Sequence, residues 1–147
     1  MPENNSPGDT GAAIPAIPAA VLKQLGQVAY EPTWHAMQDF TDSRDANEAD
    51  EFWCLEHPAI FTLGRNGDES HVLAAGDIPT LKIDRGGQVT YHGPGQLVMY
   101  TLVNVDRLGI GPRGLVTAIE NALISLLASF GITANADPKA PGVYVDG

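Results

Sequence analysis

The apolar residues in the first half of the chain predict one helix followed by two strands. Pro32 suits the first turn of a helix, and large apolar residues then recur at a spacing of three. These residues are Trp34, Met37 and Phe40. Two short apolar runs at 52–55 and 60–63 come after a polar segment, and Gly64 closes the second run. Runs of this length and composition predict buried strands.

The second half of the chain alternates before it becomes helical. Side chains at 88–92 point to alternating faces, and a Gly-Pro-Gly sequence at 93–95 then supplies the residues of a tight turn. Residues 97–105 are apolar on both faces, which predicts a central strand covered on both sides. From 115 to 130 the apolar spacing is helical, and Gly131 stands where helices often end. The helical stripe comprises Leu115, Ile119, Leu123, Leu126, Leu127 and Phe130.

The last part of the chain adds two short strand candidates, 132–133 and 143–145. Together the elements predict one α/β (α+β) domain in which helices pack on a mixed sheet. Residues 1–20 are rich in Pro, Gly, Asn and Ala and predict a flexible tail, so the domain spans 21–147. Because a buried strand rarely ends a domain with only two residues after it, we expect the domain to be C-terminally incomplete.

Charge and cysteine content narrow the possible classes of protein. A net charge of −10 predicts that the protein binds neither nucleic acid nor membranes. No apolar run reaches the length of a membrane span, and the N-terminus has no secretory signal. The single cysteine, Cys54, fits a reducing compartment, so we expect a cytoplasmic protein in which Cys54 is a buried apolar side chain. The histidines lack partners at ligand spacing, so neither a metal site nor a cofactor is predicted.

The densest group of chemically specialised residues is the stretch 85–96, RGGQVTYHGPGQ. The adjacent glycines at 86 and 87 permit positive φ and let a ligand approach the main chain, whose N–H groups then bind a ligand oxygen. Arg85 adds a permanently charged donor fork, and His92 ends the strand beside a rigid turn. A hairpin in which Gly and Pro only make turns is the alternative, although turn chemistry alone requires few of these residues.

This stretch closely resembles the signature of the lipoyl(octanoyl) transferase family, the octanoyl-carrier-protein:protein octanoyltransferases of lipoate synthesis. The resemblance extends to the Glu-His-Pro at 56–58, to the segments 61–64 and 76–79, and to 140–145. It implies a fold like that of the catalytic domain of biotin and lipoate protein ligases. It also implies that the substrate-binding residues are Arg85, Gly86, Gly87, Gln88, Val89, Thr90, Tyr91 and His92.

The resemblance implies transfer of an octanoyl group from octanoyl-acyl carrier protein to a lysine of lipoyl domains, in 2-oxoacid dehydrogenase or glycine cleavage proteins. Family members pass the acyl group through a cysteine thioester with a lysine nearby. Both residues follow Gly147 in the family pattern, so these 147 residues are expected to hold no catalytic residue and to be inactive alone. Carrier proteins are usually acidic, so we predict a local basic rim. We expect some of four residues to form it, namely Lys82, Arg85, Arg107 and Arg113.

Two alternatives from other classes remain. An ATP-dependent lipoate or biotin protein ligase shares the implied fold and also holds its ligand with a glycine-rich strand and loop. The continuous Thr-Tyr-His-Gly-Pro-Gly-Gln at 90–96 favours a transferase. The non-enzyme alternative is an acyl-binding module that keeps the loop and lacks the nucleophile.

Overall fold

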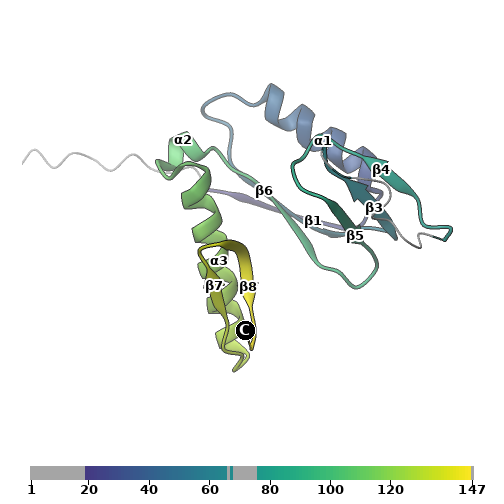
Figure 1. Ribbon diagram of the computed structural model, residues 1–147. Coiled ribbons are helices and arrows are strands. Elements are labelled where there is room, and N and C mark those ends of the chain that lie inside the picture. The colour runs from purple at the N-terminus through teal and green to yellow at the C-terminus, as the bar shows by residue number, and fades with distance from the viewer. Residues whose placement is uncertain (1–18, 66, 68–75, 147) are drawn as a thin grey trace, which may run out of the picture.

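The computed structural model describes residues 19–65, 67 and 76–146, so most of the predicted tail at 1–20 lies outside the described residues. Its helices and strands follow one another as labelled in Figure 1. They are β1 Val21–Gln27, α1 Tyr30–Ser43, β2 Glu51–Glu56, β3 Ile60–Leu63, β4 Thr80–Lys82, β5 Val89–His92, β6 Val98–Leu102, α2 Val105–Leu108, α3 Gly111–Ser129, β7 Asn135–Asp137 and β8 Ala140–Tyr144. Parallel and antiparallel strand pairs both occur, so the predicted mixed α/β class is confirmed.

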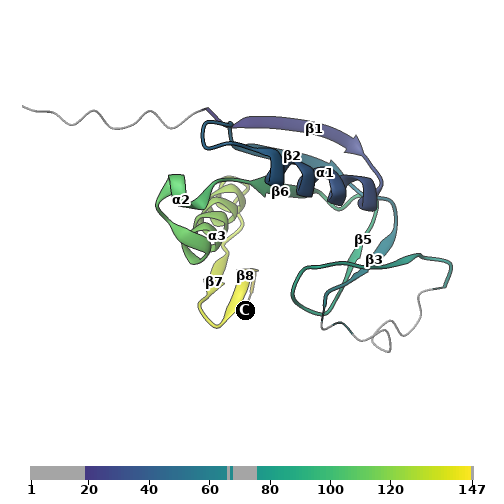
Figure 2. The same cartoon turned by 90° about the horizontal axis from the view of Figure 1, so that it is seen from above.

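Helix α1 covers one face of the first sheet, whose strand order is β1-β2-β6. Figure 2 shows the helix lying along these strands. Alternate residues of β2, namely Glu51, Trp53 and Leu55, are buried. The ring of Trp53 lies 6.4 Å from that of Phe40 in α1, measured between centroids. The predicted helix and the predicted strand at 52–55 are both confirmed. Their apolar side chains pack together at Phe40 and Trp53.

The second sheet, of order β4-β3-β5, carries the stretch with the specialised residues. Strand β3 is parallel to β4 and antiparallel to β5. In the antiparallel pair, Ile60 lies opposite His92 and Leu63 opposite Val89. Thr62 and Leu63 are fully buried, so β3 is the interior strand of this sheet. The predicted strands at 60–63 and 88–92 are confirmed, the second one residue shorter at its start.

The helix α3 and the paired strands β7 and β8, here called the C-terminal arm, lie apart from the second sheet in both views (Figures 1 and 2). Helix α3 packs mainly on α2, β7 and β8. It ends at Ser129, and Gly131, with a φ of 76°, follows the C-cap residue as predicted, while the amide of Ile132 donates to the carbonyl of Leu127. Neither this helix nor any other in the described part of the chain is long and apolar enough to cross a membrane.

Several expectations about the later elements are wrong. The predicted central strand at 97–105 is shorter, and it is not covered on both sides, because Leu97 and Met99 are exposed. No strand forms at 132–133, since these residues follow the helix cap and the next strand starts at Asn135. The helical stripe of α3 also stays open. None of the helix residues is buried, and Phe130 is 74% exposed, so the contacts with α2, β7 and β8 leave the stripe uncovered.

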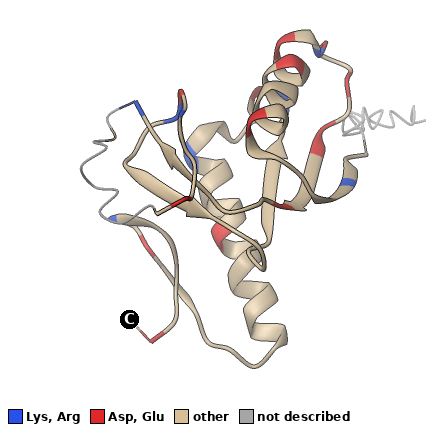
Figure 3. Cartoon of the chain, turned by 90° about the vertical axis from the view of Figure 1, so that its right-hand side faces the viewer, with Lys and Arg blue, Asp and Glu red and all other residues tan. Residues whose placement is uncertain are grey.

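The Lys and Arg positions are scattered over separate parts of the backbone (Figure 3). Two of them bind the buried Asp50, Arg44 at 2.8 Å and Arg107 at 2.6 Å. Burial alone would raise the pKa of Asp50, but hydrogen bonds from the two guanidinium groups outweigh it and hold the pKa below its usual value. Arg107 also donates to the carbonyls of Ala46 and Glu48. Arg107 therefore anchors α2 to the turn before β2, and its guanidinium group binds groups of the protein itself.

Candidate functional site

The predicted substrate-binding residues form a loop that runs directly into a strand. Arg85, Gly86, Gly87 and Gln88, here called the glycine loop, follow β4, and Val89, Thr90, Tyr91 and His92 form β5. Asp84 precedes the loop and accepts hydrogen bonds from Trp34 Nε1 and Gln38 Nε2, each at 3.1 Å. The start of the glycine loop is therefore fixed to α1.

Arg85 holds the glycine loop from within. Its Nη2 donates to the carbonyl oxygen and the hydroxyl of Thr62, at 3.0 and 2.9 Å, and to Oγ1 of Thr90 at 2.8 Å. Its Nη1 donates to the carbonyl of Gly86 at 2.8 Å. The predicted donor fork is present, but the protein itself occupies both terminal nitrogens. Arg85 thus joins β3 to β5, and its guanidinium charge is fixed in place by these hydrogen bonds.

Gly64 allows the glycine loop to lie against the end of β3. A Cβ atom at this position would overlap the carbonyl oxygen of Gly87 and would lie 2.9 Å from those of Arg85 and Gly86. Backbone hydrogen bonds hold these segments together. The amides of Gly64, Arg65 and Ile83 donate to the carbonyls of Gln88, Arg85 and Leu63, respectively. From its sequence context, Gly64 is predicted only to end a strand. Its second role depends on carbonyl groups that arrive from a distant part of the chain.

The two glycines of the loop differ in what they contribute. Gly87 has a φ of 86°, and a Cβ there would lie 3.3 Å from Nη1 of Arg85. Gly86 does not adopt positive φ, and a Cβ added to it meets nothing within 4 Å. The expected positive φ is therefore confirmed at Gly87 and wrong at Gly86. What Gly86 provides is open space above the backbone, which suits the close approach of a ligand.

A buried histidine, His57, packs against the end of β5. It is 0% exposed, and its ring lies 5.7 Å from that of His92 and 4.9 Å from that of Tyr30. Its Nδ1 lies 2.7 Å from the carbonyl oxygen of Val28, and its Nε2 lies 2.9 Å from the hydroxyl of Tyr100. A carbonyl oxygen only accepts, so Nδ1 carries the proton and Nε2 accepts from Tyr100. Burial lowers the pKa of His57 and favours this neutral ring.

Two tyrosines complete this aromatic cluster of Tyr30, His57, His92 and Tyr100. The ring of Tyr30 lies 5.3 Å from that of His92, and burial raises the pKa of both phenols, so they stay protonated. The sequence pattern does not predict this cluster, and only the family resemblance includes His57. Its hydrogen-bond partners lie 29 and 43 residues away, and no local pattern indicates them.

The turn at 93–95 is fixed by its neighbours. The amide of Gln96 donates to the carbonyl of Gly93 at 3.1 Å, and Gly95 has a φ of 84°, which confirms the predicted tight turn. A carboxylate oxygen of Glu56 accepts from the Gly95 amide at 2.8 Å. This contact ties the turn to the end of β2. His92, which precedes the turn, is therefore held on a rigid support.

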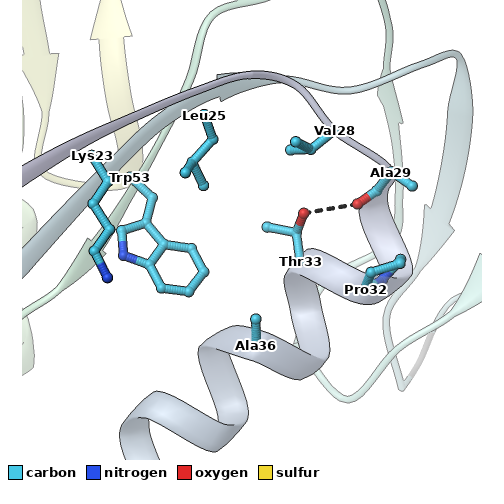
Figure 4. Close-up of a pocket in the computed structure, with 8 residues that line it drawn as sticks. All are labelled: Lys23, Leu25, Val28, Ala29, Pro32, Thr33, Ala36 and Trp53. Carbon is cyan, nitrogen blue, oxygen red and sulfur yellow. Dashed lines mark hydrogen bonds between the residues drawn. The ribbon is translucent and has the colours of Figure 1, made fainter.

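A pocket of about 460 Å³ lies between β1 and α1, away from these residues (Figure 4). It is lined by Lys23, Leu25, Val28, Ala29, Pro32, Thr33, Ala36 and Trp53. Its polar groups are already paired, since the Thr33 hydroxyl donates to the Ala29 carbonyl and Lys23 binds Glu51. No residue of the stretch 85–96 lines it. The pocket is therefore separate from the predicted substrate-binding residues.

Cys54 is half-buried, which corrects the expectation that it is a buried side chain. The reason is that α1 covers the face of β2 that carries Trp53, whereas Cys54 lies on the other face. There it lines a second pocket with Leu97 and Glu56. Among the described residues, no three His, Cys, Asp or Glu side chains gather where they could hold a metal ion.

Known proteins match the chain over most of its length. A family model of the lipoyl protein ligase A/B catalytic domain matches residues 29–147. An octanoyltransferase of Pseudomonas paraeruginosa is 62% identical over 126 residues, which cover 86% of this chain and 58% of that protein. An octanoyltransferase of Alcanivorax borkumensis is 59% identical over 128 residues, which cover 87% of this chain and 52% of that protein. The chain thus spans little more than half the length of these curated relatives.

Solved structures agree on the fold. The protein Ta0514 from T. acidophilum superposes with a TM-score of 0.62 at 12% sequence identity, over 86% of this chain and 55% of that one. P. falciparum LipL1, solved in complex with lipoate, superposes with a TM-score of 0.54 at 13% identity, over 87% of this chain and 41% of that one. At such low identity these matches bear on the fold alone.

Proposed function

Because the chain belongs to the family of the lipoyl protein ligase A/B catalytic domain, we propose that its protein transfers an octanoyl group from octanoyl-acyl carrier protein to a lysine of lipoyl domains. The observation that carries this choice is the 62% identity to an octanoyltransferase. The proposed acceptors are the lipoyl domains of 2-oxoacid dehydrogenase or glycine cleavage proteins, and the proposed location is the cytoplasm.

The glycine loop and β5 are proposed to hold the octanoyl group. Gly86 supports this role, because its open backbone lets an acyl carbonyl approach the main chain. Arg85 and Gly87 give the loop its shape, the first by its bonds to β3 and β5 and the second by its positive φ. His92 stands at the end of β5 on a rigid support, where a side chain is well placed to orient the reacting group.

We propose that the cysteine and lysine of the transfer reaction are not among these 147 residues. The one cysteine, Cys54, lies on β2, outside the glycine loop and β5. A thiolate is the reactive form, and the family chemistry pairs it with a lysine. In this proposal the 147 residues bind and orient the octanoyl group but form no thioester.

The experiment compares two proteins with octanoyl-acyl carrier protein and a lipoyl domain, read by mass spectrometry. One is the 147-residue chain. The other is a chimera in which residues 21–147 are continued by the corresponding following segment of the Pseudomonas paraeruginosa octanoyltransferase. We expect the chimera to acquire an octanoyl adduct and to pass it to the lipoyl domain without ATP. The chain alone should acquire none.

Matched variants of the chimera locate the acyl site. Gly86→Ala adds a methyl group to the open side of the loop and should reduce transfer while leaving stability unchanged. Gly76→Ala, at another open glycine outside the loop, is the control for introducing a methyl group, although its positive φ makes it the more strained change. Transfer that requires ATP and free octanoate would favour a ligase. An adduct on Cys54 that moves to the lipoyl lysine would contradict the proposed division of roles.

A further inference from the structure

We propose that Gln96 is a positioning residue that holds His92 as the Nδ1–H tautomer, so that His92 presents Nε2 as a hydrogen-bond acceptor to the N–H of an octanoyl amide. The proposal rests on the proposed function in one respect only, namely that the glycine loop and β5 hold an acyl ligand. The tautomer itself follows from contacts within the described chain.

A backbone carbonyl fixes the orientation of the Gln96 side chain. The side-chain nitrogen Nε2 of Gln96 donates to the carbonyl oxygen of Tyr91 at 3.3 Å, and Oε1 lies 2.9 Å from Nδ1 of His92. In the opposite orientation of the amide, its oxygen would face the Tyr91 carbonyl, and two acceptors would meet. The carbonyl therefore selects the orientation of the amide. With Oε1 facing the histidine, Nδ1 of His92 carries the hydrogen that is donated.

The same contacts leave the other ring nitrogen available. In a neutral imidazole one nitrogen donates and the other accepts, so a neutral His92 ring with its proton on Nδ1 has a lone pair on Nε2. Within residues 19–65, 67 and 76–146, no hydrogen-bond partner is assigned to this nitrogen. The rings of Tyr30 and His57 pack against His92 at 5.3 and 5.7 Å and restrict its rotation. The accepting nitrogen is thus held in one orientation.

A hydrogen-bond acceptor at Nε2 of His92 favours an amide ligand over the ester of the same shape. An amide R–CO–NH–R′ offers an N–H to His92, whereas the ester R–CO–O–R′ of the same shape offers only oxygens. The product of octanoyl transfer to a lysine is such an amide, and the amine that attacks the acyl group also carries N–H bonds. His92 would therefore orient the nitrogen of the acceptor lysine against the acyl carbon.

The first test reads the tautomer directly. Long-range ¹H–¹⁵N correlation spectra of the ¹⁵N-labelled chain, recorded at about pH 8 where neutral imidazole predominates, distinguish the protonated from the bare ring nitrogen. We expect Nδ1–H at His92, and His57 serves as an internal reference for the same tautomer. Gln96→Leu removes the acceptor, so Nε2–H should become populated, whereas Gln96→Glu retains an acceptor and should keep Nδ1–H. Nε2–H in the unmutated chain, or no change in Gln96→Leu, would overturn the role of Gln96.

The second test uses two neutral ligands, N-methyloctanamide and methyl octanoate, titrated into the same labelled chain. We expect the amide to bind roughly 3- to 10-fold more tightly, and the preference to shrink in Gln96→Leu and persist in Gln96→Glu. Equal affinities in the unmutated chain would overturn the acceptor role of His92. If neither ligand changes the spectrum of residues 85–92, the proposed acyl site is wrong, and the proposed acceptor role of His92 is wrong with it. The tautomer spectrum then decides the role of Gln96 independently.

Discussion

The segment from Tyr30 to Ile83 and the C-terminal arm both contain regularly spaced apolar side chains, yet they bury them very differently. Apart from Ala134, all the buried apolar side chains of the described residues lie between Tyr30 and Ile83. In the arm, Ile119, Leu123 and Leu126 of α3 are exposed. The regular spacing of apolar residues thus predicts that a helix has an apolar face, but it does not predict which element covers that face.

The difference matters for the candidate site, because the glycine loop is attached to the well-packed segment. Arg85 binds Thr62 of β3, and Asp84 binds α1. The arm makes its main contacts with α2 and within itself. Changes in the packed segment should therefore alter stability and the shape of the loop together, whereas changes in the open stripe of α3 should alter neither. The following predictions test that separation.

The largest loss of stability is expected from Asp50→Ala. This change leaves the guanidinium groups of Arg44 and Arg107 without their buried carboxylate partner, which costs about 3–5 kcal/mol. Chemical denaturation of the chain measures the loss. Asp42→Asn, at an exposed position of α1, is the control and should change the free energy of unfolding by less than about 0.5 kcal/mol. Similar values for the two variants would show that the ion-pair cluster does not organise this region.

A smaller loss of stability than in Asp50→Ala is expected from Gly64→Ala. Its methyl group would overlap the Gly87 carbonyl, and a backbone shift of this kind costs about 1–3 kcal/mol. Gly86→Ala is the matched control, because its methyl group meets no atom within 4 Å. Thermal melts should separate the two variants, and amide spectra should show the loop displaced only in Gly64→Ala. A destabilised Gly86→Ala would mean that other atoms of the protein fill the space beside Gly86.

A smaller effect should appear as a dependence of stability on pH. The pKa of His57 is lowered from its ordinary value of 6.5 in the folded protein, so the unfolded chain binds more protons below that pH. Stability should therefore fall as the pH decreases below about 6.5. Asp50 and Glu51, whose pKa values are also lowered, lose their contributions only near or below their ordinary values of 3.8 and 4.5.

The variant His57→Gln isolates this contribution. It should be less stable than the unmutated chain near neutral pH, and its free energy of unfolding should change less between about pH 7.5 and pH 5.5. Denaturant titrations at both pH values supply the comparison. If the two proteins lose stability equally on acidification, another group is responsible, and the neutral state of His57 is not required for folding.

The smallest effect on stability is expected in the open stripe. Leu126→Ser should change the melting temperature little, because this side chain is exposed on α3. It should instead reduce self-association, since exposed apolar stripes favour contacts between molecules. Light scattering at increasing concentration measures this, with Leu55→Ala as the buried contrast, for which a loss of about 2–5 kcal/mol is expected. A large drop in melting temperature for Leu126→Ser would show that the arm is packed after all.

Local chemistry allowed part of this structure to be predicted from sequence. The start of α1 at a proline-containing turn, the Gly-Pro-Gly turn and the cap at Gly131 each depend on residues within a few positions of one another. β1 was missed because most of its side chains are exposed and carry no apolar alternation. The contacts of Gly64 and His57 were missed because their partners come from distant elements.

For the candidate site, the sequence predicts which stretch of chain is involved, but it does not predict the contacts and the backbone conformation of each residue. Arg85 was expected to face a ligand, and its terminal nitrogens instead bind Thr62, Thr90 and the loop itself. The positive φ belongs to one of the two glycines only. Such details depend on which strand lies beside the loop. A pattern of residue types does not contain that information.

The close contact at Gly64 also has a consequence for local opening of the native protein. The amides of Arg65 and Ile83 donate across the contact, to the carbonyls of Arg85 and Leu63. The loop cannot lift away from β3 without breaking the first of these bonds, and the packed carbonyl groups leave little room for it to move alone. Hydrogen exchange should therefore find that these amides open together as one cooperative unit. A ligand held by the glycine loop would slow exchange along β3, at amides that it never touches.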